Sequence, residues 1–406
     1  MHVLVIGAGP SGTRCAERIA GHGGARVTLV GAEPALPYDR VSLSKLLLGA
    51  APGALVTHDM PALERLGIRY LSGTAIASID RAARAAFTAA GERLAYDRLV
   101  LATGSQAVRL PLPGAHLHGV VPYRDLADIG VMRRACRLGG PAVVIGGGLL
   151  GLEVAVALAG LGMEVTVLHA VGWPMERQLD REAGLLLTRY LESRGVRFVM
   201  PAKTAAVLGD GAAEAVLLGD GTKLPARLVV MSVGVRPEVS LARAAGLPVN
   251  RGILVDDAMR TEDPAVYAVG ECAEHRGAVC GLVAPAFAQA EAAAAAIRGE
   301  AAAYVPRTDA AALKVSGVSV WSAGEIAATD AESIVRRDEG LGHYRRLLLR
   351  DGRLVGAVLY GDTADAGLYF DLIISGRPVS AFRGALALGG AFLPGNGMAD
   401  DLKDAA

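Results

Sequence analysis

The sequence predicts an α/β fold made of two domains of related design, followed by a smaller α+β domain. Three observations support this prediction. A strand–helix–strand pattern opens the chain, and a second one begins near residue 142 with nearly the same glycine-rich turn. After residue 308 the pattern changes to alternating apolar runs, which are typical of an antiparallel sheet. A chain of 406 residues is also too long for a single compact core, so its length favours two or three domains.

The first pattern predicts strands at 3–6 and 26–30 around a helix at 11–20, and the second predicts strands at 142–145 and 165–169 around a helix at 149–161. The prolines and glycine of "RLPLPGAHLHG" break regular structure near residue 110, and the second pattern closes near "VVMSVGVRPE". The alanine-rich run "APAFAQAEAAAAAIRGE" favours a packed helix. We therefore predict three domains: residues 1–112 with 237–306, residues 113–236, and residues 307–406, where Asp351-Gly352 indicates a hairpin.

Composition excludes several classes of protein. Lysine plus arginine and aspartate plus glutamate both number 41, which argues against a broad nucleic-acid or anionic-lipid surface. The sequence contains no run of about 18 consecutive apolar residues, so no membrane span is predicted. Because the first predicted strand begins at Val3, we expect a cytoplasmic protein without a leader. The four cysteines (Cys15, Cys136, Cys272 and Cys280) show no C-x-x-C spacing, which excludes a redox dithiol and an iron–sulfur cluster. The eight histidines show no metal-ligand spacing, so no metal is expected.

The first glycine-rich turn has the spacing G-x-G-x-x-G, formed by Gly7, Gly9 and Gly12. The first glycine permits a tight turn, the second lets the backbone approach a pyrophosphate, and the third lets the helix pack on the sheet. Pro10 and Ser11 open that helix, whose N-terminus would face the phosphates. Glu33 follows the second strand, 21 residues after Gly12, where a carboxylate can accept ribose hydroxyl protons. The pattern predicts a Rossmann-like dinucleotide-binding domain.

The second turn repeats this design with Gly146, Gly148 and Gly151, and Leu149 and Leu150 open its helix. The strand-end position that is acidic in the first domain holds His169 here. The usual indication of NAD over NADP is therefore missing, and Arg177, eight residues further on, is far for a 2′-phosphate clamp. We expect NADH or NADPH at this site, with NADH favoured.

Two dinucleotide sites on adjacent domains imply a hydride that passes between two cofactors, one a resident flavin and the other a diffusible nicotinamide. Hydride transfer needs the two rings stacked at about 3 to 3.5 Å, and no protein nucleophile is required.

Over residues 1 to about 306 these motifs resemble the FAD-dependent pyridine nucleotide oxidoreductases. "VIGAGPSG" with Glu33 is similar to the FAD adenosine site, "LATGS" (101–105) to the second FAD motif, and "YAVGE" (267–271) to the third. The resemblance implies a glutathione-reductase-like flavoprotein fold. The cofactor contacts that it implies beyond the two turns are Arg40, Ala102, Thr103, Gly104, Gly234, Gly270 and Glu271. Glu271, where aspartate is more usual, would bond the ribityl or pyrophosphate portion of FAD.

The stretch "EPALPYDRVSLSKLLLG" (33–49) resembles the flavin-contacting segment of ferredoxin, rubredoxin and nitrite reductase flavoproteins. That resemblance implies that Lys45 lies by the isoalloxazine and that Glu153 pairs with it where nicotinamide stacks. A lysine and a glutamate there would tune the flavin potential and the reduced anion. The alternative is that both are ordinary surface charges of their helices.

The C-terminal stretches "LKVSGVSVWSAGEI" and "LVGAVLYGDTADAGLYFDLIISGRPV", with "MERQLD" (175–180), resemble the large subunit of bacterial NAD(P)H-dependent nitrite reductases. Those chains continue with a cysteine-rich segment and a siroheme domain, whereas this one ends at "GMADDLKDAA". We therefore expect an electron-transfer flavoprotein that does not reduce nitrite alone. Its acceptor would be an iron–sulfur, siroheme or molybdenum reductase component of nitrate or nitrite assimilation.

Alternatives remain open at this point. A rubredoxin or ferredoxin reductase and a flavin-only NADH oxidase fit the same motifs, and a non-catalytic NADH-sensing flavoprotein is a further alternative. Trp321 and His275 lie in a strand and a loop that could approach the flavin or belong to the core. The last domain could also provide a homodimer face.

Overall fold

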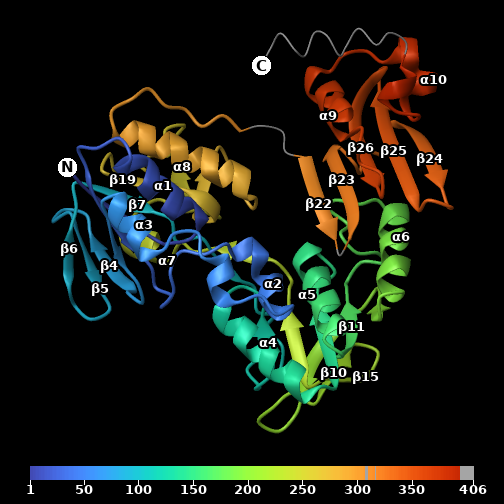
Figure 1. Cartoon of the computed structure of the whole chain (residues 1–406), viewed down its shortest axis with the longest axis horizontal. Coiled ribbons are helices and arrows are strands. Elements are labelled where there is room, and N and C mark those ends of the chain that lie inside the picture. Colours follow the sequence, from blue (N-terminus) through green and yellow to red (C-terminus); the bar gives the residue numbers. More distant parts are fainter. Residues whose placement is uncertain (307–309, 316, 394–406) are drawn as a thin grey trace. The chain divides into compact units, whose positions relative to one another are not determined.

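The computed structural model describes residues 1–306, 310–315 and 317–393, so the C-terminal "GMADDLKDAA" lies outside the described residues (Figure 1). The chain divides into two compact units. The first comprises Met1–Val108, Arg124–Gly130 and Gly234–Arg307, and the second comprises Arg109–Tyr123, Val131–Val233 and Thr308–Ala406. Each unit is described by itself.

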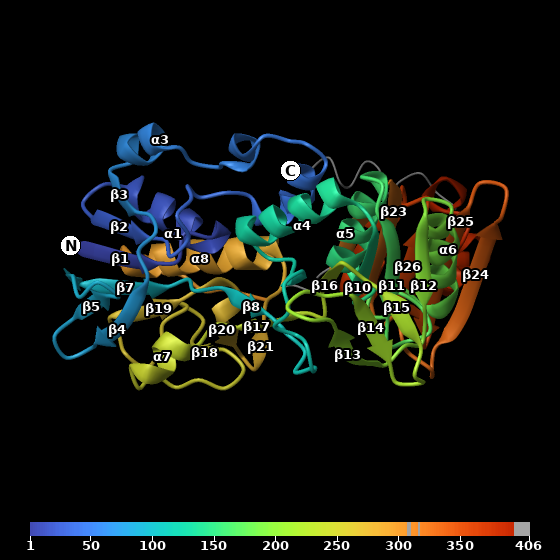
Figure 2. The ribbon, with the colours of Figure 1, turned by 90° about the horizontal axis from the view of Figure 1, so that it is seen from below.

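The first unit is built on a five-stranded parallel sheet of order β19-β7-β1-β2-β3. Its strands are β1 (His2–Ile6), β2 (Arg26–Val30), β3 (Ile68–Leu71), β7 (Arg98–Leu101) and β19 (Val266–Ala268). Helix α1 (Pro10–Ala20) connects β1 to β2, and the alanine-rich helix α8 (Val283–Ile297) packs beside α1 (Figure 1). Figure 2 shows β1, β2 and β3 side by side.

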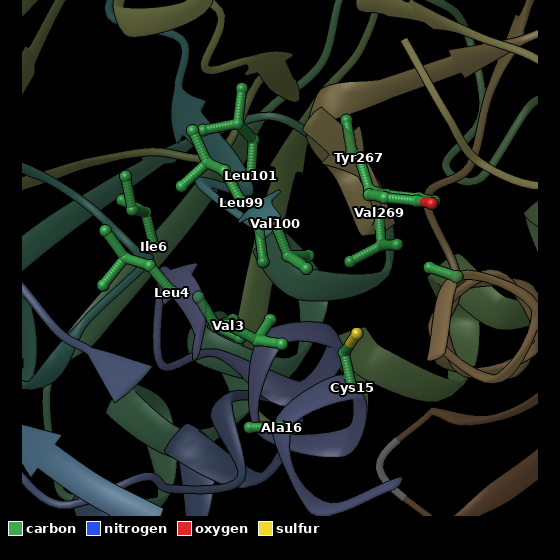
Figure 3. Close-up of a cluster of buried hydrophobic side chains, with 14 of the residues drawn as sticks. Val3, Leu4, Ile6, Cys15, Ala16, Leu99, Val100, Leu101, Tyr267 and Val269 are labelled. Atoms are coloured by element: carbon green, nitrogen blue, oxygen red, sulfur yellow. The ribbon is translucent and has the colours of Figure 1, made fainter. Parts of the chain in front are cut away.

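Continuous apolar runs form the centre of this sheet, because parallel strands are covered on both faces. Val3, Leu4 and Val5 of β1 are completely buried. Figure 3 shows side chains of β1, β7 and α1 gathered in the same core. The glycine-rich turn that follows β1 is therefore held by a rigid strand on one side and a packed helix on the other.

Shorter elements complete the first unit. An antiparallel meander is formed by β4 (Ile76–Asp80), β5 (Ala85–Thr88) and β6 (Arg93–Ala95), and β8 (Ser105–Ala107) pairs with β17 (Val235–Pro237). A three-stranded sheet contains β18 (Ile253–Val255), β20 (Ala273–His275) and β21 (Ala278–Val279). The short helices are α2 (Leu43–Leu47), α3 (Met60–Arg65) and α7 (Ser240–Ala244).

The second unit repeats the architecture of the first, with a parallel sheet of order β12-β11-β10-β16-β9. Its strands are β9 (Val120–Pro122), β10 (Pro141–Ile145), β11 (Glu164–Leu168), β12 (Val196–Val199) and β16 (Leu228–Met231). Helix α5 (Leu149–Gly160) connects β10 to β11, and α6 (Arg181–Glu192) connects β11 to β12. The meander is β13 (Thr204–Leu208), β14 (Ala215–Leu218) and β15 (Lys223–Pro225). Helix α4 (Leu126–Leu138) precedes β10 in the chain, and its first residues belong to the Arg124–Gly130 segment of the first unit.

The C-terminal part is a five-stranded antiparallel sheet of order β22-β23-β26-β25-β24. Its elements are β22 (Ala310–Val315), β23 (Val318–Gly324), β24 (Glu332–Asp338), β25 (His343–Arg350), β26 (Arg353–Tyr360), α9 (Ala366–Ser375) and α10 (Arg383–Leu386). The predicted hairpin is confirmed, with Asp351 and Gly352 at φ of +50° and +69° between β25 and β26. Trp321 of β23 is 5% exposed and packs in the core of this sheet and its helices.

Element boundaries differ slightly from the prediction. Helix α1 begins at Pro10, one residue early, because proline is well tolerated at the first helical position. Strand β11 spans Glu164–Leu168, so His169 lies one residue beyond it. Within the described ranges, no helix combines the length and apolar character that a bilayer crossing requires.

Candidate functional site

The three glycines of the first turn have different surroundings. A Cβ on Gly7, whose φ is +112°, would lie 2.0 Å from the carbonyl oxygen of Ala102, and one on Gly12 would lie 1.9 Å from that of Gly7. A Cβ on Gly9 would meet no other described atom within 4 Å. Two glycines are thus required by packing, whereas the middle one faces open space where a ligand can approach the backbone.

The N-terminus of α1 suits an anion. Its N-cap residue is Gly9, no side chain caps the helix, and the first turn, which includes Pro10 and Ser11, has no acidic residue. The unpaired N–H groups and the positive end of the helix dipole therefore remain available to a phosphate.

Glu33, just after β2, has a fixed carboxylate. Its Oε2 accepts a hydrogen bond from the Tyr38 hydroxyl at 2.7 Å, and its Oε1 pairs with Arg40 at 2.5 Å. A second Arg40 nitrogen donates to the carbonyl of Arg124 at 2.7 Å. Burial raises the pKa of Tyr38, so its hydroxyl keeps its proton as a donor. Since each carboxylate oxygen has two lone pairs, Glu33 can still accept from ribose hydroxyls.

Two further segments of the first unit meet this turn. Gly270 has φ of +79°, and its Cβ would lie 2.4 Å from the Ser11 hydroxyl oxygen, so a side chain there would collide with α1. The Gly270 N–H donates to the buried amide oxygen of Gln289 at 2.8 Å. Glu271 accepts at Oε2 from Ser105 at 2.7 Å and from Arg124 at 2.6 Å. The predicted second and third motifs therefore converge on the first.

The segment after β7 is anchored by the chain near β17. The Thr103 hydroxyl donates to the carbonyl of Glu238 at 2.7 Å, and Glu238 N–H donates to the Gly104 carbonyl at 2.9 Å. Gly234 has φ of +105°, and its carbonyl accepts from Val108 at 3.0 Å. Lys45 lies on α2 with an exposed side chain.

The three glycines of the second turn have the same kinds of surroundings as those of the first. A Cβ on Gly146, whose φ is +119°, would lie 2.0 Å from the carbonyl oxygen of Ser232, and one on Gly151 would lie 2.0 Å from that of Gly146. A Cβ on Gly148 would meet no other described atom within 4 Å. Helix α5, which opens with Leu149 and Leu150, also lacks a side-chain cap and an acidic first turn. This turn therefore fits a second dinucleotide.

His169, after β11, contacts the second turn directly. Its Nδ1 accepts from the Gly147 N–H at 3.1 Å, and its Nε2 lies 3.0 Å from Glu176 Oε2. Glu153 is half-buried on α5, and burial raises the pKa of its carboxyl group. Because Lys45 and Glu153 belong to different units, their pairing stays a prediction.

His275, Cys15 and Cys272 lie inside the protein, whereas Cys136 and Cys280 are partly exposed. His275 is 2% exposed, its Nε2 lies 2.8 Å from an Asp257 carboxylate oxygen, and its ring edge meets Tyr304. None of the four cysteines forms a disulfide, and burial raises the pKa of Cys15 to about 12. Among the described residues, no group of three histidine, cysteine or acidic side chains could hold a metal.

Sequence reasoning did not assign Tyr38, Arg124 or Glu176. Tyr38 stands in the flavin-contacting stretch, and Glu176 stands in "MERQLD", so both carried a weak local signal. Arg124 carried none, because it meets Glu271 across 147 residues of sequence.

Each unit has a parallel sheet of the same topology, with a glycine-rich turn that leads into a helix N-terminus. We call these two turns, Gly7–Gly12 and Gly146–Gly151, the cradles, and together they define a protein that binds two dinucleotides. Comparison with known proteins supports this class. Residues 1–296 match the family model described as pyridine nucleotide-disulphide oxidoreductase, and residues 310–377 match the rubredoxin NAD+ reductase C-terminal domain. The chain belongs to the pyridine nucleotide-disulphide oxidoreductase family.

Three relatives are informative. The chain is 41% identical to a nitrite reductase [NAD(P)H] of Bacillus subtilis, over 91% of this chain and 47% of that protein. It is 38% identical to the assimilatory nitrate reductase electron transfer subunit of Bacillus subtilis, over 93% of this chain and 50% of that protein. A solved ferredoxin reductase from Rhodopseudomonas palustris is 29% identical, with a TM-score of 0.84 over 95% of this chain and 99% of the other.

These findings confirm the predicted family, the α/β flavoprotein fold with its C-terminal α+β domain, and the enzyme class, an FAD-dependent NAD(P)H oxidoreductase. They equally confirm FAD and NAD(P)H as the cofactors. The chain spans about half the length of the two Bacillus subtilis relatives, so their whole activities do not transfer with the resemblance.

Proposed function

We propose that the chain accepts hydride from NADH or NADPH and delivers electrons to a separate redox protein of nitrate or nitrite assimilation. The acceptor would be an iron–sulfur, siroheme or molybdenum reductase component. The observation that carries the proposal is the pair of equivalent cradles, each with open space at its middle glycine, Gly9 and Gly148. The two Bacillus subtilis relatives, whose names refer to nitrite and nitrate reduction, support the pathway.

Bound FAD would supply the redox chemistry, because its ring takes a hydride and can release electrons singly. The residues of this chain bind and orient. Glu33, held by Tyr38 and Arg40, would accept the ribose hydroxyls of FAD, and the N-terminus of α1 would meet its pyrophosphate. Glu271 would orient the ribityl or pyrophosphate portion.

The remaining predicted roles belong to the same proposal. Lys45 would lie by the flavin ring and Glu153 by the nicotinamide, with the nucleotide held at Gly146–Gly151. We assign residues 1–112 and 237–306 to the FAD domain, 113–236 to the NAD(P)H domain and 307–406 to the C-terminal domain. A homodimer stays a prediction. Four cysteines without a disulfide among them support a cytoplasmic location, where disulfides are rare.

The second candidate function is that of a rubredoxin or ferredoxin reductase. It is supported by the match of residues 310–377 to the C-terminal domain of rubredoxin reductases and by the solved ferredoxin reductase. The two candidates share the reductive half and differ in the protein acceptor.

Anaerobic mixing tests the common step. The purified FAD-loaded chain is mixed with NADH or NADPH while flavin absorbance is followed, and prompt bleaching is expected. Candidate acceptors are then added: a rubredoxin, a ferredoxin, and nitrate and nitrite reductase components. Re-oxidation by a reductase component only would support the first function, and re-oxidation by rubredoxin or ferredoxin only would support the second. Failure of both nucleotides to bleach the flavin would refute both, and fast oxygen consumption without an acceptor would indicate an oxidase.

A further inference from the structure

His169 directly follows β11, and the donor and acceptor roles of its two ring nitrogens follow from their hydrogen-bond partners. Gly147 N–H can only donate, so His169 Nδ1 accepts and the ring proton sits on Nε2. That proton points to Glu176 Oε2 at 3.0 Å. With its one acceptor atom occupied by backbone, the neutral His169 ring has none to offer a ribose hydroxyl.

The segment that carries Glu176 is docked on the glycine turn. Met175 is 1% exposed and has φ of +55°, and its N–H donates to the Gly147 carbonyl at 3.0 Å. Its own carbonyl accepts from the N–H groups of Gln178 and Leu179, each at 2.8 Å. Gly147 therefore fixes the histidine through its N–H and the glutamate segment through its carbonyl.

The Glu176 carboxylate is thus a positioned acceptor at the end of β11. The His169 proton occupies one site on Oε2, and 32% of the Glu176 side chain stays exposed. Each carboxylate oxygen can accept two hydrogen bonds, so acceptor capacity remains for a ligand. Figure 2 shows β10 and β11 side by side, and the turn after β10 and the residue after β11 lie at the same sheet edge.

We propose that Glu176, positioned by His169, receives the adenosine ribose hydroxyls and makes this site selective for NADH over NADPH. The inference rests on the proposed function, since it requires the nicotinamide nucleotide at Gly146–Gly151. A carboxylate accepts protons from a 2′-hydroxyl, whereas it repels a 2′-phosphate, which carries a charge near −2. The acid expected immediately after the strand is thereby supplied seven residues later, by His169 and Glu176 acting together.

Binding of adenosine fragments tests this without turnover. The FAD-loaded protein is titrated by calorimetry with 5′-AMP and with 2′,5′-ADP, which differ only in the 2′-phosphate. We expect the wild type to bind 5′-AMP at least about tenfold more tightly, a difference of about 1.4 kcal/mol. Glu176→Gln should reduce this ratio about tenfold, mainly through tighter binding of 2′,5′-ADP. Salt should weaken the wild-type discrimination, because it screens exposed charges.

The matched control is Glu164→Gln, which removes the same charge at the opposite end of β11, where the side chain is 72% exposed and pairs with Arg197 at 3.7 Å. This control should leave the ratio unchanged. His169→Asp in the Glu176→Gln background returns a carboxylate to the strand end and should restore the preference for 5′-AMP. That rescue would show that the discrimination depends on a carboxylate at this edge of the sheet.

An unchanged ratio in Glu176→Gln, or equal wild-type affinity for the two fragments, would overturn the inference. If Glu176→Gln does not fold, the wild-type ratio and its salt dependence decide. Binding of both fragments without discrimination would leave the proposed function intact. If neither fragment binds and neither NADH nor NADPH bleaches the flavin, the proposed function itself fails, and the inference with it.

Discussion

Replacing Gly148 by alanine should weaken nucleotide binding at least about tenfold and leave the folded chain and its FAD intact. Gly148 has φ of −77° and ψ of 174°, a backbone conformation that alanine adopts without strain. Its Cβ would meet no other described atom within 4 Å. The new methyl group would therefore project into the space where the pyrophosphate must approach the backbone.

The effect on stability is the sum of two small terms of opposite sign. Alanine restricts the unfolded chain and stabilises the fold by about 0.4–1 kcal/mol. Because Gly148 is the N-cap of α5, where alanine is less favourable than glycine, a cost of about 1 kcal/mol opposes it. The net change should lie within about 1 kcal/mol. Losing a single charge-assisted hydrogen bond to phosphate costs about 1.5–3 kcal/mol, so nucleotide affinity should fall at least about tenfold.

The assay compares three properties of purified Gly148→Ala: FAD content by absorbance, the urea midpoint, and the dissociation constant for NAD+ by calorimetry. Gly9→Ala is the mirror control and should lose FAD instead. Gly151→Ala is the packing control, because its Cβ would lie 2.0 Å from a backbone oxygen, and it should destabilise the second unit. Wild-type affinity for NAD+ in Gly148→Ala would refute the assignment of this cradle.

Three further predictions concern buried charge and caps. Burial raises the pKa of Glu153 above its ordinary 4.5, so ionising this carboxyl group lowers the free energy of unfolding. The loss is absent below pH 4.5 and complete above the raised pKa. In urea unfolding, Glu153→Gln should therefore match wild-type stability at pH 4 and exceed it at pH 8. Arg124→Ala should cost about 1–3 kcal/mol and weaken FAD retention, because it removes a 2.6 Å partner from the partly buried Glu271 carboxylate; full FAD occupancy after gel filtration would contradict this. Asp180→Ala should cost about 2 kcal/mol, measured by thermal unfolding, because Asp180 caps α6 and accepts from the Tyr344 hydroxyl at 2.6 Å.

The two cradles could be predicted from the sequence because every determinant of them is local. Gly7, Gly9 and Gly12 lie within six residues, and the apolar run before them and the helix after them are continuous in the chain. The spacing also separates the two packing glycines from the ligand-facing one, and the observed surroundings of each agree with that division. The same reasoning applied to Gly146–Gly151 gave the same result.

The partners of the site could not be predicted, because they are distant in sequence or depend on unusual backbone. Arg124 reaches Glu271 across 147 residues, and Gly270 finds Gln289 only because α8 packs against α1. Glu176 is only seven residues from His169, but it reaches the ring through a left-handed Met175, a conformation that nothing in the local sequence indicates. Pairing of that kind follows from the completed fold.

If the first turn binds FAD and the second the nicotinamide nucleotide, as proposed, the surroundings of each turn would explain why one cofactor is resident and the other exchangeable. In the first unit the glycine turn is joined by Glu33, by the Gly104–Ser105 segment and by Gly270–Glu271, all cross-linked by hydrogen bonds. In the second unit, among the described residues, the turn is joined by the Ser232 segment and by His169 together with the docked segment that carries Glu176. Because a pre-organised site loses little entropy on binding, and dissociation requires its contacts to break together, more converging segments mean a slower release. On the proposed assignment, the first turn would therefore hold FAD for many turnovers, and the second would release a nicotinamide nucleotide after each.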